Sequence, residues 1–67
     1  MHYDKLEIIH ESLINGQRKQ MVNQIDEYGL YDFWEDYQHF LYKSYATKTA
    51  FDYFSDATIS YFRIKNR

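Results

Sequence analysis

Three carboxylates, Asp32, Glu35 and Asp36, lie within one five-residue stretch and are the first candidates for chemistry in this chain. Paired carboxylates can hold Mg²⁺ or exchange protons with a substrate. The alternative is that they occupy the first turn of a helix, where acids satisfy free N–H groups and the helix dipole. We favour the helix interpretation, because no base that would position a substrate accompanies them.

The histidines do not form a recognisable metal motif. His10-Glu11 resembles the start of a zinc-protease helix, but the second histidine that this motif requires would be residue 14, which is Ile14. His2 and His39 are far away in the sequence, and the chain has no cysteine to complete a zinc site. Since nucleophile and phosphate-loop motifs are also missing, we expect a protein that is not an enzyme and that binds no metal or cofactor.

Two groups of cations could contact a nucleic-acid backbone. Arg18 and Lys19 follow Asn15-Gly16 at the expected start of a helix, where backbone N–H groups favour anions. The second group, at the C-terminus, consists of Arg63, Lys65 and Arg67. Together with tyrosines that stack on bases, these cations predict weak binding of single-stranded nucleic acid as an alternative function. The ordinary alternatives are a solvated turn and cations that complement a helix C-terminus, and a net charge of −2 argues against strong binding.

The middle of the chain is acidic. Residues 26–56 contain seven acids against two lysines, a net charge of −5. Such a segment could imitate the phosphates of a nucleic acid and occupy the DNA-binding cleft of an enzyme. Seven acids are few for a mimic of this kind, so we rank this alternative below simple protein docking.

Aromatic side chains are the most unusual feature of the composition: 14 of 67 residues, eight of them tyrosine. A chain of this length buries only about 60% of its unfolded surface, so some rings must remain at the surface. Protein interfaces favour Tyr, Trp and Phe because these residues provide large, rigid contact areas. We therefore predict a partner-binding surface made of rings and neighbouring acids: Tyr31, Trp34, Tyr42, Tyr53, Asp32, Glu35 and Asp36.

Apolar residues recur with helical period and predict an all-α domain over residues 1–67, a bundle of three or four short helices. The first two helices are expected to form a hairpin, closed by Asn15-Gly16 and ended by Gly29. A third helix should begin at Asp32, capped with help from Glu35, and run to about Ala46. The expected core consists of Leu6, Ile9, Leu13, Met21, Val22, Ile25, Phe33, Tyr37, Phe40, Leu41, Phe51, Phe54 and Phe62.

A fourth helix should begin at a cap formed by Thr47 or Thr49 and run to about Ile64. Residues 58–64 are also rich in strand-favouring side chains, but a single strand would have no partner to pair with. The chain has no apolar run of 18 residues, no cysteine and no signal-peptide pattern at its start. We therefore expect a cytoplasmic protein that does not interact with membranes.

The segments Asn15-Gly16-Gln17-Arg18-Lys19-Gln20 and Tyr28-Gly29-Leu30-Tyr31-Asp32-Phe33-Trp34, and the ending 59–65, resemble small uncharacterised proteins of Gram-positive phages, plasmids and chromosomal cassettes. The resemblance extends over most of the chain and implies no particular activity. It implies an accessory subunit or inhibitor of a larger enzyme of DNA processing or defence. We accordingly predict a non-enzymatic protein-binding module, with a homodimer as a simple variant.

Overall fold

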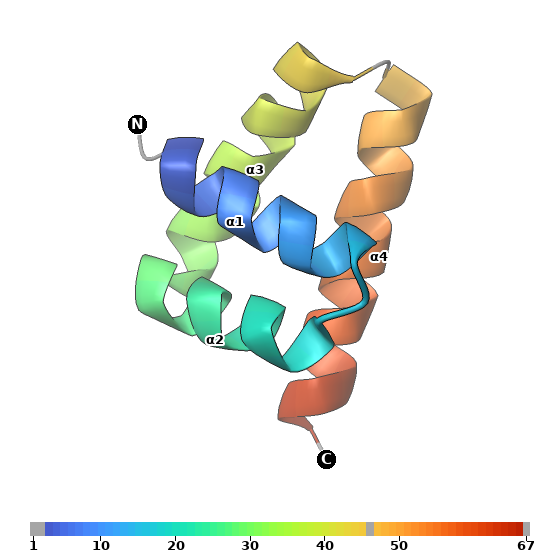
Figure 1. Cartoon of the computed structure of the whole chain (residues 1–67). Coiled ribbons are helices and arrows are strands. Elements are labelled where there is room, and N and C mark those ends of the chain that lie inside the picture. The colour runs from blue at the N-terminus through green and yellow to red at the C-terminus, as the bar shows by residue number, and fades with distance from the viewer. Residues whose placement is uncertain (1–2, 46, 67) are drawn as a thin grey trace.

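The chain folds into four α-helices in a computed structural model that describes residues 3–45 and 47–66. The helices are α1 (Tyr3–Ile14), α2 (Arg18–Tyr28), α3 (Leu30–Ser44) and α4 (Thr47–Lys65). One antiparallel pair, α1 and α2, lies across a second antiparallel pair, α3 and α4 (Figure 1). The predicted all-α bundle of short helices is confirmed, and residues 58–64 belong to α4.

The connection between α1 and α2 is a tight turn centred on Gly16. Gly16 has a φ of 76°, in the left-handed region that glycine adopts without strain. Its N–H donates to the Leu13 carbonyl at 3.2 Å, and the Gln17 N–H donates to the Ser12 carbonyl at 2.7 Å. This pair of hydrogen bonds is a Schellman motif, which satisfies the last carbonyls of α1. The predicted glycine cap at this position is confirmed.

A single residue, Gly29, separates α2 from α3. Its φ of 108° turns the chain sharply, and its carbonyl accepts a hydrogen bond from the Phe33 N–H at 2.8 Å. The prediction that α3 begins at a capping pair of Asp32 and Glu35 is wrong, because α3 begins at Leu30 and its start has no side-chain cap. Asp32 lies inside the first turn, where its charge still complements the helix dipole.

The boundary between α3 and α4 lies close to the predicted position. α3 ends at Ser44, and the next N–H, that of Tyr45, donates to the Leu41 carbonyl at 2.9 Å. Residue Ala46, the predicted end of this helix, lies outside the described residues, as does the side chain of Thr47. α4 begins at Thr47, so Thr49 lies within the helix and is not its cap.

The core is formed where the two helix pairs cross. Most of the expected residues are buried there, with Phe40 and Phe54 partly buried at its edge. The expectation for Phe51 and Phe62 is wrong, since they are 62% and 44% exposed. α4 instead turns a different face to the core: Ala50, Ala57 and Tyr61. The two alanines are small enough for α4 to approach its neighbours closely, which directs the phenylalanine rings beside them outward.

Candidate functional site

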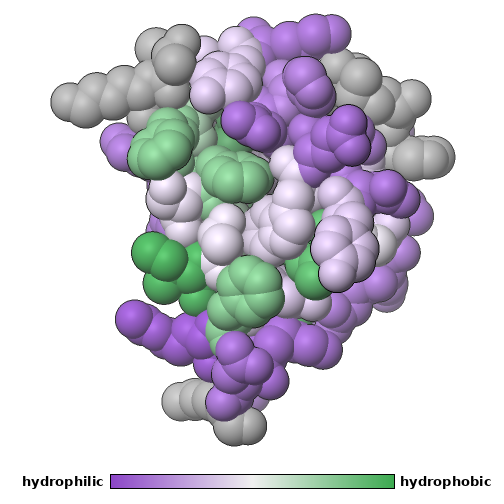
Figure 2. Space-filling model, turned by 180° about the vertical axis from the view of Figure 1, so that it is seen from behind, coloured by the Kyte–Doolittle hydropathy of each residue, from purple (hydrophilic) through white to green (hydrophobic). Residues whose placement is uncertain are grey.

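The outer side of the α3–α4 pair, turned away from α1 and α2, has a continuous aromatic and aliphatic surface. Figure 2 shows this side, with apolar side chains gathered over its middle and polar ones around them. We call this surface the aromatic face. It consists of Tyr31, Trp34 and Tyr42 from α3 and Phe51, Phe54, Ile59 and Phe62 from α4.

The aromatic face arises because α4 is apolar along two stripes. Ala50, Ala57 and Tyr61 form the inner stripe and pack into the core. Phe51 and Phe62 form the ends of the outer stripe and lie three helical turns apart, on the same side of the helix. A soluble helix normally has one apolar stripe and a polar remainder. The ends of the second stripe of α4, Phe51 and Phe62, remain largely exposed.

Ring contacts connect the core to the aromatic face. The Trp34 indole lies 4.6 Å from the buried Phe33 ring, between ring centroids, and 5.6 Å from the Phe54 ring. It also stacks on Phe62 at 6.2 Å. Edge-to-face and stacked pairs of this kind hold rings in fixed positions. Three rings of the aromatic face, those of Trp34, Phe54 and Phe62, are therefore held in place by neighbouring rings.

Two shallow hollows shape the aromatic face. One, with a volume of about 70 Å³, lies between α3 and α4 and is lined by Gln38, Tyr42, Ala50, Phe51 and Phe54. The other lies along α4, where Ser55 and Thr58 form a low floor between Phe51 and Ile59. The Thr58 hydroxyl donates to the Phe54 carbonyl of its own helix at 2.8 Å, so it needs no partner from outside. Both hollows could receive apolar side chains of another molecule.

The predicted binding rings do not all lie on this face. Tyr31 is 85% exposed and Tyr42 is 45% exposed, and both lie on the outer side of α3. Trp34 is partly buried and forms the support described above. Tyr53 lies on the other side of α4, where its ring contacts those of His10 and Tyr45. The structure therefore brings three of the four predicted rings together.

Four apolar members of the aromatic face, Phe51, Phe54, Ile59 and Phe62, were not among the predicted binding residues. Three of them, the phenylalanines, were assigned to the core from their helical spacing. A sign of their true position was present in the sequence, since α4 has more apolar residues than one stripe can hold. Comparing the two candidate stripes would have shown that one of them is exposed, without showing which one.

The predicted acids are at the surface, and one of them has a defined partner. Asp32 and Glu35 are exposed. Asp36 accepts a hydrogen bond from the Tyr28 hydroxyl at 2.5 Å. Burial, and then this hydrogen bond, raises the pKa of the Tyr28 phenol. Among residues 3–45 and 47–66, no three His, Asp or Glu side chains are grouped closely enough to hold a metal ion.

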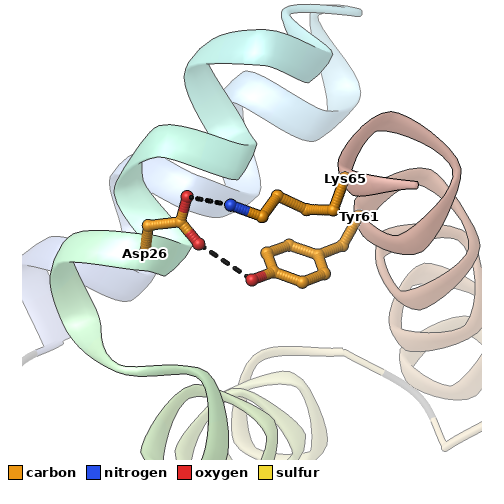
Figure 3. Close-up of polar contacts among 3 residues, drawn as sticks. All are labelled: Asp26, Tyr61 and Lys65. Atoms are coloured by element: carbon orange, nitrogen blue, oxygen red, sulfur yellow. Dashed lines mark hydrogen bonds and ion pairs between the residues drawn. The ribbon is translucent and has the colours of Figure 1, made fainter. Parts of the chain in front are cut away.

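Two of the predicted nucleic-acid cations form ion pairs between helices. Arg18 of α2 lies 3.2 Å from the Asp56 carboxylate of α4. Lys65 lies 3.1 Å from Asp26, whose other oxygen accepts a hydrogen bond from the Tyr61 hydroxyl at 2.8 Å (Figure 3). This hydrogen bond from Tyr61 is the main cause that lowers the pKa of Asp26.

The other three cations of the nucleic-acid alternative do not form a common site with these two. Lys19 and Arg63 are exposed, on α2 and α4 respectively. Arg67 lies outside the described residues. Because Arg18 and Lys65 are engaged with carboxylates, the charge that the described cations offer to a phosphate backbone is reduced.

No protein-family model, no curated protein and no solved structure matches the chain. Within the described residues, none of the helices has both the length and the apolar character needed to cross a bilayer. A function for the chain is therefore inferred from the geometry of the molecule itself.

A buried polar cluster around His10 is the feature that sequence analysis missed most completely. The ring is 3% exposed, with Nδ1 3.0 Å from the Tyr37 hydroxyl and Nε2 2.6 Å from the Tyr45 hydroxyl. A neutral imidazole has one donor and one acceptor, and a hydroxyl can complement either. Burial is the main cause that lowers the pKa of His10 and favours this neutral form. Because the ring is almost completely covered, its hydrogen bonds join α1 to Tyr37 of α3 and to Tyr45 just after α3.

Proposed function

We propose that the chain is a non-enzymatic, cytoplasmic protein-binding module that docks through the aromatic face. The observation that supports this most strongly is the exposure of Tyr31, Phe51 and Ile59, each more than half exposed, on one surface. With about 200 Å² for each fully exposed ring, the aromatic face presents about 500 Å² of ring and aliphatic surface. Apolar patches of this size on small proteins commonly mark interaction sites.

The surroundings of the aromatic face also suit an interface. Its large side chains are aromatic or aliphatic, and charged residues such as Glu35 and Asp52 lie at exposed positions on the same two helices. Natural interfaces combine a mainly apolar patch with a polar rim in this way. Trp34 is held against Phe33 and Phe62, so ordering these rings on docking costs little conformational entropy.

The class of partner follows from the resemblance to small proteins of Gram-positive mobile elements. Such proteins act as accessory subunits or inhibitors, so we propose a target among DNA-processing or defence enzymes. The alternative of an acidic nucleic-acid mimic has less support, because Asp26, Asp36 and Asp56 are already paired within the fold. Direct binding of single strands has less support for the corresponding reason, since Arg18 and Lys65 are paired.

The test is affinity capture with immobilised variants in a Gram-positive host extract, followed by titration of each captured protein. Ile59→Ala and Ile14→Ala form a matched pair, since the two isoleucines are 56% and 51% exposed and only Ile59 is on the aromatic face. At a hot spot, truncation costs about 2 kcal/mol, or about 30-fold in affinity. We expect this loss for Tyr31→Ala and Ile59→Ala and unchanged binding for Ile14→Ala, with wild-type circular dichroism throughout.

Two results would contradict the proposal. One is equal affinity of the wild type and all variants of the aromatic face for every captured protein. The other is tight, steeply salt-dependent binding of labelled single-stranded oligonucleotides, which would favour a nucleic-acid function.

A further inference from the structure

We propose that the isolated chain covers its aromatic face with a second copy of itself, in a two-fold dimer whose α4 helices run antiparallel. This inference rests on the proposed function, because it names an occupant for the same surface. A target protein would then compete with the second copy.

The spacing of the large rings is the first argument. Phe51 and Phe62 on α4 are 11 residues apart, and so are Tyr31 and Tyr42 on α3. Eleven residues make about three helical turns, so each pair of rings marks the two ends of one stripe about 16 Å long. A two-fold axis across the middle of the stripe brings each Phe51 against Phe62 of the other copy, and each Tyr31 against Tyr42.

Both helices share this midpoint. At one end of the aromatic face, Trp34 of α3 stacks on Phe62 of α4. At the other end, Tyr42 and Phe51 line the same hollow. One axis therefore passes through the middle of both stripes. A self-complementary contact of this kind is what a two-fold dimer requires.

The middle of the α4 stripe suits close approach of two helices. Phe51, Ser55, Thr58 and Phe62 follow one another at steps of four, three and four residues, the spacing of the seam between paired helices. The two central residues are small, and the Thr58 hydroxyl is satisfied within its own helix. Ser55 and Thr58 let the α4 helices of the two copies approach each other closely at the middle, while Phe51 and Phe62 pack against each other at the ends.

Charge favours the antiparallel direction. Asp52 and Arg63, also 11 residues apart, lie on one flank of the α4 stripe, and both are exposed. Within the described residues, neither has an ion-pair partner. Antiparallel packing places Asp52 near Arg63 of the second copy, twice by symmetry. Parallel packing would put these side chains of the two copies on opposite flanks of the seam, so this pairing would be lost.

The available area is sufficient for a second copy. The molecule extends 32 × 23 × 20 Å, so its broad side covers roughly 700 Å² in projection. Specific interfaces bury about 600–1,000 Å² per partner, a range that includes this area. A chain of 67 residues also has a small core, and association adds stability that depends on concentration.

Sedimentation equilibrium over a range of concentrations tests the dimer, and charge reversal tests its direction. We expect twice the chain mass for the wild type and about tenfold weaker association for Asp52→Arg and for Arg63→Asp. The double variant should recover association, because both charge pairs are restored in reverse. Glu11→Arg, an exposed reversal on α1, serves as the control and should associate like the wild type. Circular dichroism of each variant confirms that the monomer is folded.

A wild type that stays monomeric at every concentration would overturn the dimer. The proposed function would still stand if variants of the aromatic face bound a captured target less tightly than the wild type does. If the wild type stayed monomeric and these variants also bound every captured protein as tightly as the wild type does, both proposals would be rejected. A dimer that forms but shows no recovery in the double variant would overturn the antiparallel arrangement.

Discussion

Replacing His10 with leucine measures how much the buried polar cluster stabilises the fold. The Tyr37 side chain is completely buried and its hydroxyl lies 3.0 Å from the His10 ring, so the variant leaves this hydroxyl without that partner. An unsatisfied buried group of this kind costs about 1–3 kcal/mol. Tyr45 is more than a third exposed and can bind water instead, so it adds little. We expect the free energy of unfolding to fall by about 2 kcal/mol, a large share of the roughly 3–10 kcal/mol typical for this length.

Urea unfolding followed by circular dichroism provides the measurement. A change in stability alone shifts the midpoint of the transition and leaves its slope unchanged. The control is His10→Leu combined with Tyr37→Phe, which removes both polar partners and should recover most of the loss. Tyr37→Phe should therefore cost much less stability in the His10→Leu background than in the wild type. If it costs the same free energy of unfolding in both backgrounds, the two residues are not coupled and the reasoning is refuted.

Three further predictions concern other parts of the molecule. As the pH falls below 6.5, the ordinary pKa of histidine, the unfolded chain takes up a proton at His10 before the folded chain does, because the folded pKa is lowered. The free energy of unfolding should therefore decline on acidification until the folded pKa is reached, and urea titrations of His10→Leu should lack this decline. Tyr61→Phe should lower the free energy of unfolding by about 1 kcal/mol at neutral pH. The Tyr61 hydroxyl is the main cause that lowers the pKa of Asp26 below its ordinary value of 3.8, so the difference in stability between Tyr61→Phe and the wild type should shrink as Asp26 is protonated below that pH. A constant difference in urea titrations down to pH 2 would contradict this prediction. Gly29→Ala should lower the melting temperature, because alanine is strained at a φ of 108° and the free energy of unfolding should fall by more than about 1 kcal/mol. Glu27→Ala, at an exposed position of α2, should change the free energy of unfolding by less than about 0.5 kcal/mol.

The helix boundaries could be predicted closely from the sequence because they depend on local backbone geometry. Gly16 and Gly29 both adopt positive φ, which other residues rarely do, and each marks the end of a helix. The period of the apolar residues also identified the sides of the first three helices that face the core, because each of these helices has a single apolar stripe. The start of α3 was misplaced because a glycine turn can replace a side-chain cap.

The orientation of α4 and the role of His10 could not be predicted in this way. Two apolar stripes compete on α4, and the choice depends on how closely the alanines let it approach α1, α2 and α3. The partners of His10 are 27 and 35 residues away in the sequence, so its burial becomes explicable only once the helices are placed. The composition indicated that the chain has more aromatic side chains than its core can bury, but only the packing of the helices decides which of them remain exposed.

The position of Trp34 gives the molecule a built-in optical probe. It is the single indole in the chain, and it touches the interior through Phe33 and the outer surface through Phe62. Indole emission moves to shorter wavelength when water is displaced from around the ring. Any ligand that settles over this side of the protein can therefore be followed by fluorescence without a label, and selective excitation separates this signal from that of the eight phenols.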